Sequence, residues 1–82
     1  MRDTQIPLDD VTVDRSGRPV RFRYQGRLQV VRQQLDDWRT GGRWWLDEPP
    51  RDCYLVETAQ VLAELHREDP PSSRWWLARI QD

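Results

Sequence analysis

Residues 18–31 read RPVRFRYQGRLQVV, and this stretch decides the fold class. From Val20 to Tyr24 the side chains alternate strictly. Val20, Phe22 and Tyr24 lie on one side, and Arg21 and Arg23 lie on the other, as expected of a half-buried β-strand. The chain is therefore predicted to be built from strands.

The residues that follow predict a hairpin. Gln25-Gly26 has turn composition, and residues 27–31 return as a second strand. A simple two-residue turn pairs Phe22 with Gln29, which mismatches the apolar faces. One extra residue in the turn pairs Phe22 with Val30 and Tyr24 with Leu28, so we predict a β-bulge here.

Further elements follow along the chain. Val31, Leu35 and Trp38 are spaced i, i+4, i+7, which predicts a short helical turn before the glycine pair at 41–42. Strands are predicted over residues 43–46, 53–58 and 74–81. For residues 60–67 the apolar spacing fits a helix or a strand. The Ala, Glu and Leu content favours a helix, but we favour a strand, because a meander needs one between its neighbours.

These elements predict a mainly β fold, a small antiparallel curled sheet or half-open barrel of about five strands with one short helical turn. Residues 18–82 form this single small β domain, and residues 1–17 form a flexible acidic arm, which can still add a short edge strand. With a hydrophobic fraction of only 37%, the core must come from a few large side chains. The expected core comprises Val20, Phe22, Tyr24, Leu28, Val30, Leu35, Trp38, Tyr54, Val56, Leu65, Leu77 and one Trp of each pair described next.

The sequence Arg-Trp-Trp-Leu occurs twice, at residues 43–46 and 74–77. Successive side chains of a strand point to opposite faces, so each pair would place one indole in the core and one outside. In the first pair Trp45, beside Arg43, is expected to point outward. For the second pair the choice between Trp75 and Trp76 stays open.

The composition argues against an enzyme. One Cys (Cys53) and one His (His66) exclude an intramolecular disulfide, a Cys-based metal site and a His cluster. Cys53 is expected to be a buried small hydrophobe. The acidic pairs have no partner that would make them a metal site or a hydrolytic pair. No catalytic, cofactor-binding or metal-binding residue is predicted, and with neither signal peptide nor membrane span the protein is expected to be cytoplasmic.

The charges are unevenly distributed. All thirteen basic residues are Arg, and the net charge is −3 over residues 1–14, +6 over 15–43 and −4 over 44–82. Arg and exposed Trp side chains serve protein interfaces, and they also stack on and neutralise single-stranded nucleic acid. The predicted binding surface consists of Arg21, Arg23, Arg43, Trp45, Trp75 and Trp76.

Several residue runs resemble a known family. They are Phe22-Arg23-Tyr24-x-Gly26, Leu35-x-x-Trp38-Arg39, Gly42-Arg43-Trp44-Trp45, Pro49-x-Arg51-x-x-Tyr54-x-Val56-Glu57-Thr58 and Arg74-Trp75-x-Leu77-x-Arg79-Ile80-x-Asp82. Over about residues 18–82 the chain resembles a small uncharacterised domain of actinobacteria and the Deinococcus–Thermus group. That family occurs beside Y-family translesion DNA polymerases of the mutasome type. The resemblance implies a context of DNA damage tolerance and carries over no catalytic residues.

Two functions follow as expectations. The first is a non-enzymatic adaptor that binds a protein, with a Y-family polymerase as the partner that the resemblance implies. The alternative is a single-stranded nucleic-acid-binding module that uses Arg and Trp side chains, although the chain as a whole is not basic. The sequence leaves open the oligomeric state, dimerisation through a free edge strand, and masking of the basic block by the acidic arm.

Overall fold

The computed structural model describes residues 1–42 and 44–82, and strands dominate this part of the chain. The mainly β prediction is therefore confirmed, with eight strands described where about five were expected. The elements are β1 (Arg2–Leu8), β2 (Val11–Val13), β3 (Pro19–Tyr24), β4 (Arg27–Val30), β5 (Gln33–Thr40), the 3-10 helix η1 (Trp44–Leu46), β6 (Arg51–Glu57), β7 (Leu62–Glu68) and β8 (Trp75–Gln81).

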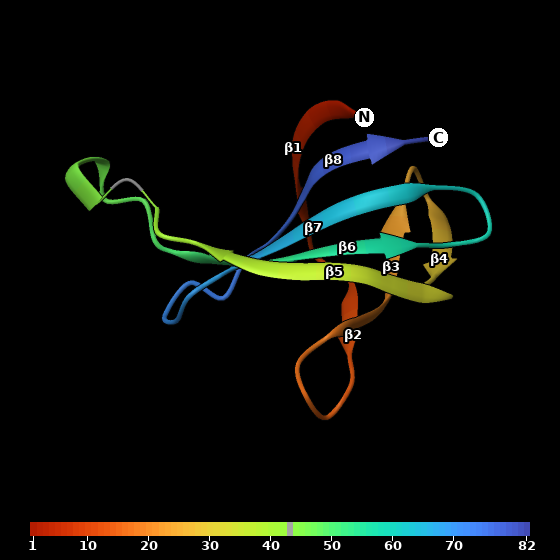
Figure 1. Ribbon diagram of the computed structural model, residues 1–82, viewed down its shortest axis with the longest axis horizontal. Coiled ribbons are helices and arrows are strands. Elements are labelled where there is room, and N and C mark those ends of the chain that lie inside the picture. Colours follow the sequence, from red (N-terminus) through yellow and green to blue (C-terminus); the bar gives the residue numbers. More distant parts are fainter. Residues whose placement is uncertain (43) are drawn as a thin grey trace.

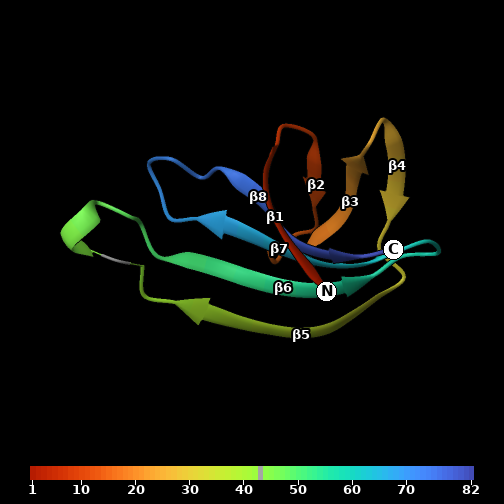
Figure 2. The same cartoon turned by 90° about the horizontal axis from the view of Figure 1, so that it is seen from above.

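The strands form two antiparallel sheets, one of five strands in the order β1-β8-β7-β6-β5 and one of three in the order β2-β3-β4 (Figure 1). The smaller sheet stands on one face of the larger one, which leaves the opposite face uncovered by it (Figure 2). Neither sheet of the described chain closes on itself, so the fold is a pair of open, packed sheets and not a closed barrel. Residues 60–67 are largely strand, as favoured above.

The core lies between the two sheets. Phe22 and Tyr24 from β3 pack against apolar side chains of β6, β7 and β8, and Phe22 has no exposed surface. Phe22, Tyr24, Val56, Leu65 and Leu77 are confirmed as buried core, and Tyr54 packs against them. Burying a ring of the size of Phe22 stabilises a small domain by several kcal/mol, on the order of 25 cal/mol per Å² of apolar surface.

The predicted bulge between β3 and β4 is wrong. The strands pair Tyr24 with Arg27 and Phe22 with Gln29, which is the register of a two-residue turn. Gln25 and Gly26 both have positive φ angles, of 53° and 75°, as a tight type I′-like hairpin requires. This register does mismatch the apolar faces of the two strands. Gln29 is buried, whereas Leu28 and Val30, predicted as core, are 47% and 53% exposed.

The predicted helical turn at Leu35–Trp38 is also wrong, because these residues belong to strand β5. Gln34 pairs with Val56 and Asp36 with Leu55, so Leu35 is an extra residue at a bulge. A bulge breaks the two-residue period of a strand, and the resulting apolar spacing imitates a helix. Both Leu35 and Trp38, predicted as core, are exposed, as suits a strand at the sheet edge.

Residues 43–46 were predicted to be a strand, and the described part of this segment is instead the helical turn η1. It lies in the connection between β5 and β6, which extends beyond the sheets at one end of the molecule (Figure 1). Positive φ angles at Gly42 (69°) and Asp47 (56°) mark the two sides of η1. Such reversals interrupt a strand, which explains why the first Trp pair does not lie in one.

Residues 1–17, expected to be an arm, are mostly strand. β1 pairs with β8 from Arg2↔Ile80 to Leu8↔Trp75, and β2 pairs with β3. Arg2 adds a hydrogen bond of 2.9 Å from its guanidinium to the Tyr24 hydroxyl. The segment therefore completes both sheets, which corrects the expectation of a separate arm.

Candidate functional site

The face of the large sheet that points away from the small sheet carries most of the polar chemistry. Cys53 pairs with His66, and His66 pairs with Trp76, so these three residues form a row across β6, β7 and β8. Glu64 and Glu68 lie on the same face as His66, because residues two apart on a strand share a face. Cys53 and His66 are buried in this row.

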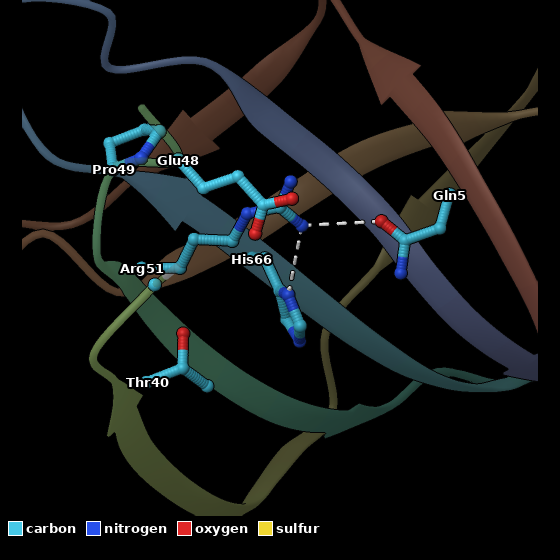
Figure 3. Close-up of a pocket in the computed structure, with 7 residues that line it drawn as sticks. Gln5, Thr40, Glu48, Pro49, Arg51 and His66 are labelled. Carbon is cyan, nitrogen blue, oxygen red and sulfur yellow. Dashed lines mark hydrogen bonds between the residues drawn. The ribbon is translucent and has the colours of Figure 1, made fainter. Parts of the chain in front are cut away.

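Arg51 is the centre of the polar cluster (Figure 3). Its Nη1 donates to Gln5 Oε1 at 3.2 Å and faces His66 Nδ1 at 3.4 Å. Its Nη2 lies 3.9 Å from a Glu68 carboxylate oxygen. On the other side of the ring, His66 Nε2 lies 2.6 Å from Glu64 Oε2. The cluster borders a cavity of about 610 Å³ lined by Gln5, Thr40, Gly42, Glu48, Pro49, Arg51 and His66.

The geometry assigns the protons of the imidazole. A guanidinium can only donate, so the contacts suit the His66 tautomer in which Nδ1 accepts from Arg51 and Nε2 faces Glu64 with its hydrogen. A carboxylate–imidazole pair is the arrangement of a general base. Here, however, Arg51 occupies the nitrogen at which a substrate proton would be taken.

Trp76 completes this cluster. The Arg51 and Arg74 guanidinium carbons lie 5.1 and 5.7 Å from its ring centroid, within cation–π range. Its indole Nε1 is buried without a hydrogen-bond partner among the described residues. Trp75 points to the core side, is buried, and lies 5.8 Å from the ring centroid of Tyr54. The second Trp pair thus straddles the sheet as predicted, and neither indole is freely exposed.

The sequence analysis did not find the cluster of Arg51, Glu64, His66 and Glu68. The signal was present at residues 64, 66 and 68, which alternate Glu-x-His-x-Glu. Once this segment is a strand, that alternation places three ionisable side chains on one face. The ambiguity between helix and strand for residues 60–67 concealed it.

Arg21 and Arg23 lie on the outward face of the small sheet, opposite Val30 and Leu28 of β4. Arg23 Nε contacts Asp10 Oδ2 at 2.8 Å. Since Asp10 lies in the acidic N-terminal segment, one residue of that segment does neutralise one residue of the basic block.

Among the side chains that the structure describes, the most exposed aromatic one lies in the connection between β5 and β6. Trp45 is 62% exposed and Leu46 is 56% exposed, so the outward prediction for Trp45 is confirmed. We call these two residues the η1 tip. Arg43 and the side chain of Trp44 lie outside the described residues.

The predicted surface residues do not form one surface. The η1 tip lies at one end of the molecule, away from β3 with Arg21 and Arg23 (Figure 1). Trp75 belongs to the core, and Trp76 belongs to the Arg51 cluster on the other face of the large sheet. Of these places, only the η1 tip exposes a Trp side chain to this extent.

Two further searches of the described residues were negative. No group of three or more His, Cys, Asp and Glu side chains is placed to hold a metal ion in the part that the structure describes. Within residues 1–42 and 44–82, no helix has the length and apolar character needed to cross a membrane.

Comparison with known proteins gives a family and no relative of known function. Neither a curated protein nor a solved structure matches the chain. A family model described as "Domain of unknown function (DUF6504)" matches residues 5–82, which is nearly the whole chain. The protein therefore belongs to the DUF6504 family.

Proposed function

We propose that this domain is a non-enzymatic accessory module that binds another protein through the η1 tip. The observation that supports the proposal is the 62% exposure of Trp45 on a projection from the sheets, next to the 56% exposed Leu46. Trp is enriched among the residues that dominate binding energy at protein interfaces. Removing the apolar surface of an exposed indole from water is favourable, so burial of Trp45 against a partner protein would stabilise the complex.

The base of the projection is closely packed. Gly42 has a positive φ angle and lies so close to the backbone of Glu48 and Pro49 that an added Cβ would stand 2.5 Å from the Glu48 carbonyl oxygen. This contact joins the two sides of the connection just before η1. A tip held in place loses less conformational entropy on binding than a loose loop would.

Ion pairs make nucleic acid the second choice. Arginines in contact with carboxylates have less charge to offer to phosphates, and nucleic-acid readers carry a clear positive balance. Among the described residues, the arginines in such contacts include Arg2, Arg23, Arg39, Arg51 and Arg79. A protein partner requires no such surplus of positive charge.

The partner and its setting follow from the sequence resemblance. It favours a Y-family translesion polymerase, and with it a role in DNA damage tolerance in the cytoplasm. A compact domain with a projecting aromatic tip suits docking onto another protein of this kind. These statements are part of the proposal and rest on the residue runs described above.

The test is a binding titration of the purified domain against the Y-family polymerase from the same genome, by calorimetry. We expect binding, and a loss of roughly 30-fold or more in affinity for Trp45→Ala, as for an interface hot spot. Val30→Ser is the matched control, because Val30 is 53% exposed on the other sheet and away from the tip. Equal effects of the two changes would reject the tip as the contact surface.

A second titration separates the alternative function. A labelled single-stranded oligonucleotide is followed by anisotropy at about 50 and 200 mM salt, because phosphate contacts weaken steeply with salt. Binding that depends on Arg21, together with no binding to the polymerase, would reverse the order of the two functions. Absence of binding to both would refute the polymerase as partner and leave no support for the nucleic-acid reading.

A further inference from the structure

Strand β5 leaves one edge of the large sheet open. It spans Gln33–Thr40, pairs only with β6, and has no described element beyond its other side (Figure 2). From Asp36 to Thr40 its pairing with β6 is regular, so that stretch has a straight, repeating backbone. The backbone N–H and C=O groups along such an edge can pair with another strand. The Asp37 N–H is an exception, because it donates to Asp36 Oδ1 at 2.8 Å.

The opposite edge is blunted. β1 contains Pro7, which has no N–H to donate, and a register shift between Asp3 and Ile6. Gln5, within that shift, has a positive φ angle of 48°. Proline and bulges are the usual means of protecting an edge strand from pairing. Of the two edges of this sheet, only β5 keeps a regular stretch without such a device.

The side chains along β5 define what can pair with it. Asp36 and Asp37 are both exposed, and Trp38 beside them is 39% exposed. Arg39 is already held by Asp52, at 2.7 Å, and by Asp69. β5 itself carries two carboxylates and one guanidinium, a net charge of −1. The edge therefore offers the apolar side chain of Trp38 beside the negative charges of Asp36 and Asp37.

This charge pattern disfavours a second copy. Antiparallel self-pairing centred between the two acids sets Asp36 opposite Asp37, and centring on one acid sets that acid opposite itself. Centring on Trp38 sets Asp37 opposite Arg39, which Asp52 and Asp69 already hold. Like charges directly opposite each other on neighbouring strands are destabilising. The same acids attract a basic strand. The charges of β5 therefore disfavour a second copy of the chain and favour a basic peptide.

We propose that β5 binds an extended basic peptide segment of a partner by strand addition. The segment runs antiparallel to β5, with an apolar residue opposite Trp38 and basic residues opposite Asp37 and Asp36. Those backbone groups of residues 36–40 that face away from β6 give affinity through hydrogen bonds, and the alternate side chains give specificity. This contact is separate from the η1 tip.

The test uses a fluorescein-labelled probe peptide that contains Thr-Val-Arg-Arg-Val-Thr, titrated with the full chain and followed by anisotropy. We expect micromolar binding that weakens with salt. We expect Asp36→Asn/Asp37→Asn to reduce the affinity about five- to tenfold, as for two exposed ion pairs. Asp9→Asn, which removes one exposed acid far from β5 in the sequence, is the charge control and should change little.

Two controls decide whether a strand is added. A probe with its central residues N-methylated keeps its charges and loses backbone donors, so it should bind at least tenfold more weakly. Equal binding of the methylated probe, or no binding of the original one, would overturn the proposal.

Sedimentation velocity of the protein alone should show a monomer. A dimer that Asp37→Arg disrupts would assign the edge to a second copy and also overturn the proposal. If the probe does not bind but Trp45→Ala still weakens binding to the polymerase, the β5 proposal fails and the proposed function stands.

Discussion

The Thr58 hydroxyl donates a hydrogen bond of 2.8 Å to the Gln29 side-chain oxygen inside the protein, and this bond joins the two sheets. Both residues are buried. The same hydroxyl accepts hydrogen bonds from the backbone N–H groups of Gln60 and Val61, at 3.2 and 3.1 Å. One side chain therefore shapes the turn between β6 and β7 and also satisfies the polar group that the β3–β4 register places in the core.

Thr58→Val should destabilise the domain by about 1–3 kcal/mol, because it leaves buried polar groups without partners. The measurement is urea unfolding followed by Trp fluorescence. In a Gln29→Leu background the same change should cost less, because one of the orphaned groups is then already absent. Thr12→Val on β2 is the control and should stay within about 0.5 kcal/mol. Equal costs in both backgrounds would contradict a direct coupling between Thr58 and Gln29.

Gly42→Ala should lower stability by about 2 kcal/mol or more. A left-handed backbone conformation alone costs a non-glycine residue about 1–2 kcal/mol, and the new Cβ would also stand 2.5 and 2.8 Å from two carbonyl oxygens. Gly41→Ala is the matched control, because nothing lies within 4 Å of its added Cβ. We expect that change to be neutral or to stabilise by up to about 1 kcal/mol. Thermal unfolding of the two variants side by side gives the answer.

The sequence predicted those features that follow from strict alternation. Phe22 and Tyr24 alternate with arginines, and both are buried as expected. Trp75 and Trp76 are adjacent on β8 and point to opposite faces. In these stretches, local pattern and tertiary burial agree, so the pattern was sufficient.

The wrong predictions arose where the two-residue alternation of apolar side chains along a strand does not decide the structure. The extra residue Leu35 at the β5 bulge turned strand spacing into apparent helix spacing. In the β3–β4 hairpin, tight-turn geometry at residues 25–26 outweighed the matching of apolar faces. The cost of that mismatch is offset by Thr58, a residue 29 positions away from Gln29 in the sequence. A partner so distant is visible only in three dimensions.

Phe22→Ala should destabilise the domain by about 3–5 kcal/mol, because a fully buried ring is replaced by a cavity. Leu28→Ala, on the neighbouring strand, should cost less than about 1 kcal/mol because Leu28 is 47% exposed. The pair of variants also tests the hairpin register. If a bulge placed Leu28 in the core, its truncation would cost about 2–5 kcal/mol, and urea unfolding resolves this difference. Phe22→Leu provides a milder core change should the alanine variant fail to fold.

Cys53 should be an unreactive thiol up to strongly alkaline pH. Burial, with a smaller contribution from the Glu64 carboxylate, raises the pKa of its thiol to about 11. The thiolate is the reactive form, so alkylation by iodoacetamide at pH 8 should be much slower in the folded protein than in urea. An alkylation rate in the native protein that rises with an apparent pKa near the ordinary value of 9.0 would contradict this environment.

The same raised pKa has a consequence for stability. Above about pH 9 the thiol of the unfolded chain loses its proton while that of the folded chain keeps it, so the unfolded state binds fewer protons and the free energy of unfolding falls with pH. The loss should develop between the ordinary pKa of 9.0 and about 11. Burial also raises the pKa of the Tyr54 hydroxyl, which acts in the same direction. The difference between the wild type and Cys53→Ala, measured by urea unfolding from pH 8 upward, isolates the thiol, because Tyr54 contributes equally to both. A stability difference that does not change with pH across this window would show that Cys53 is not buried as the structure places it.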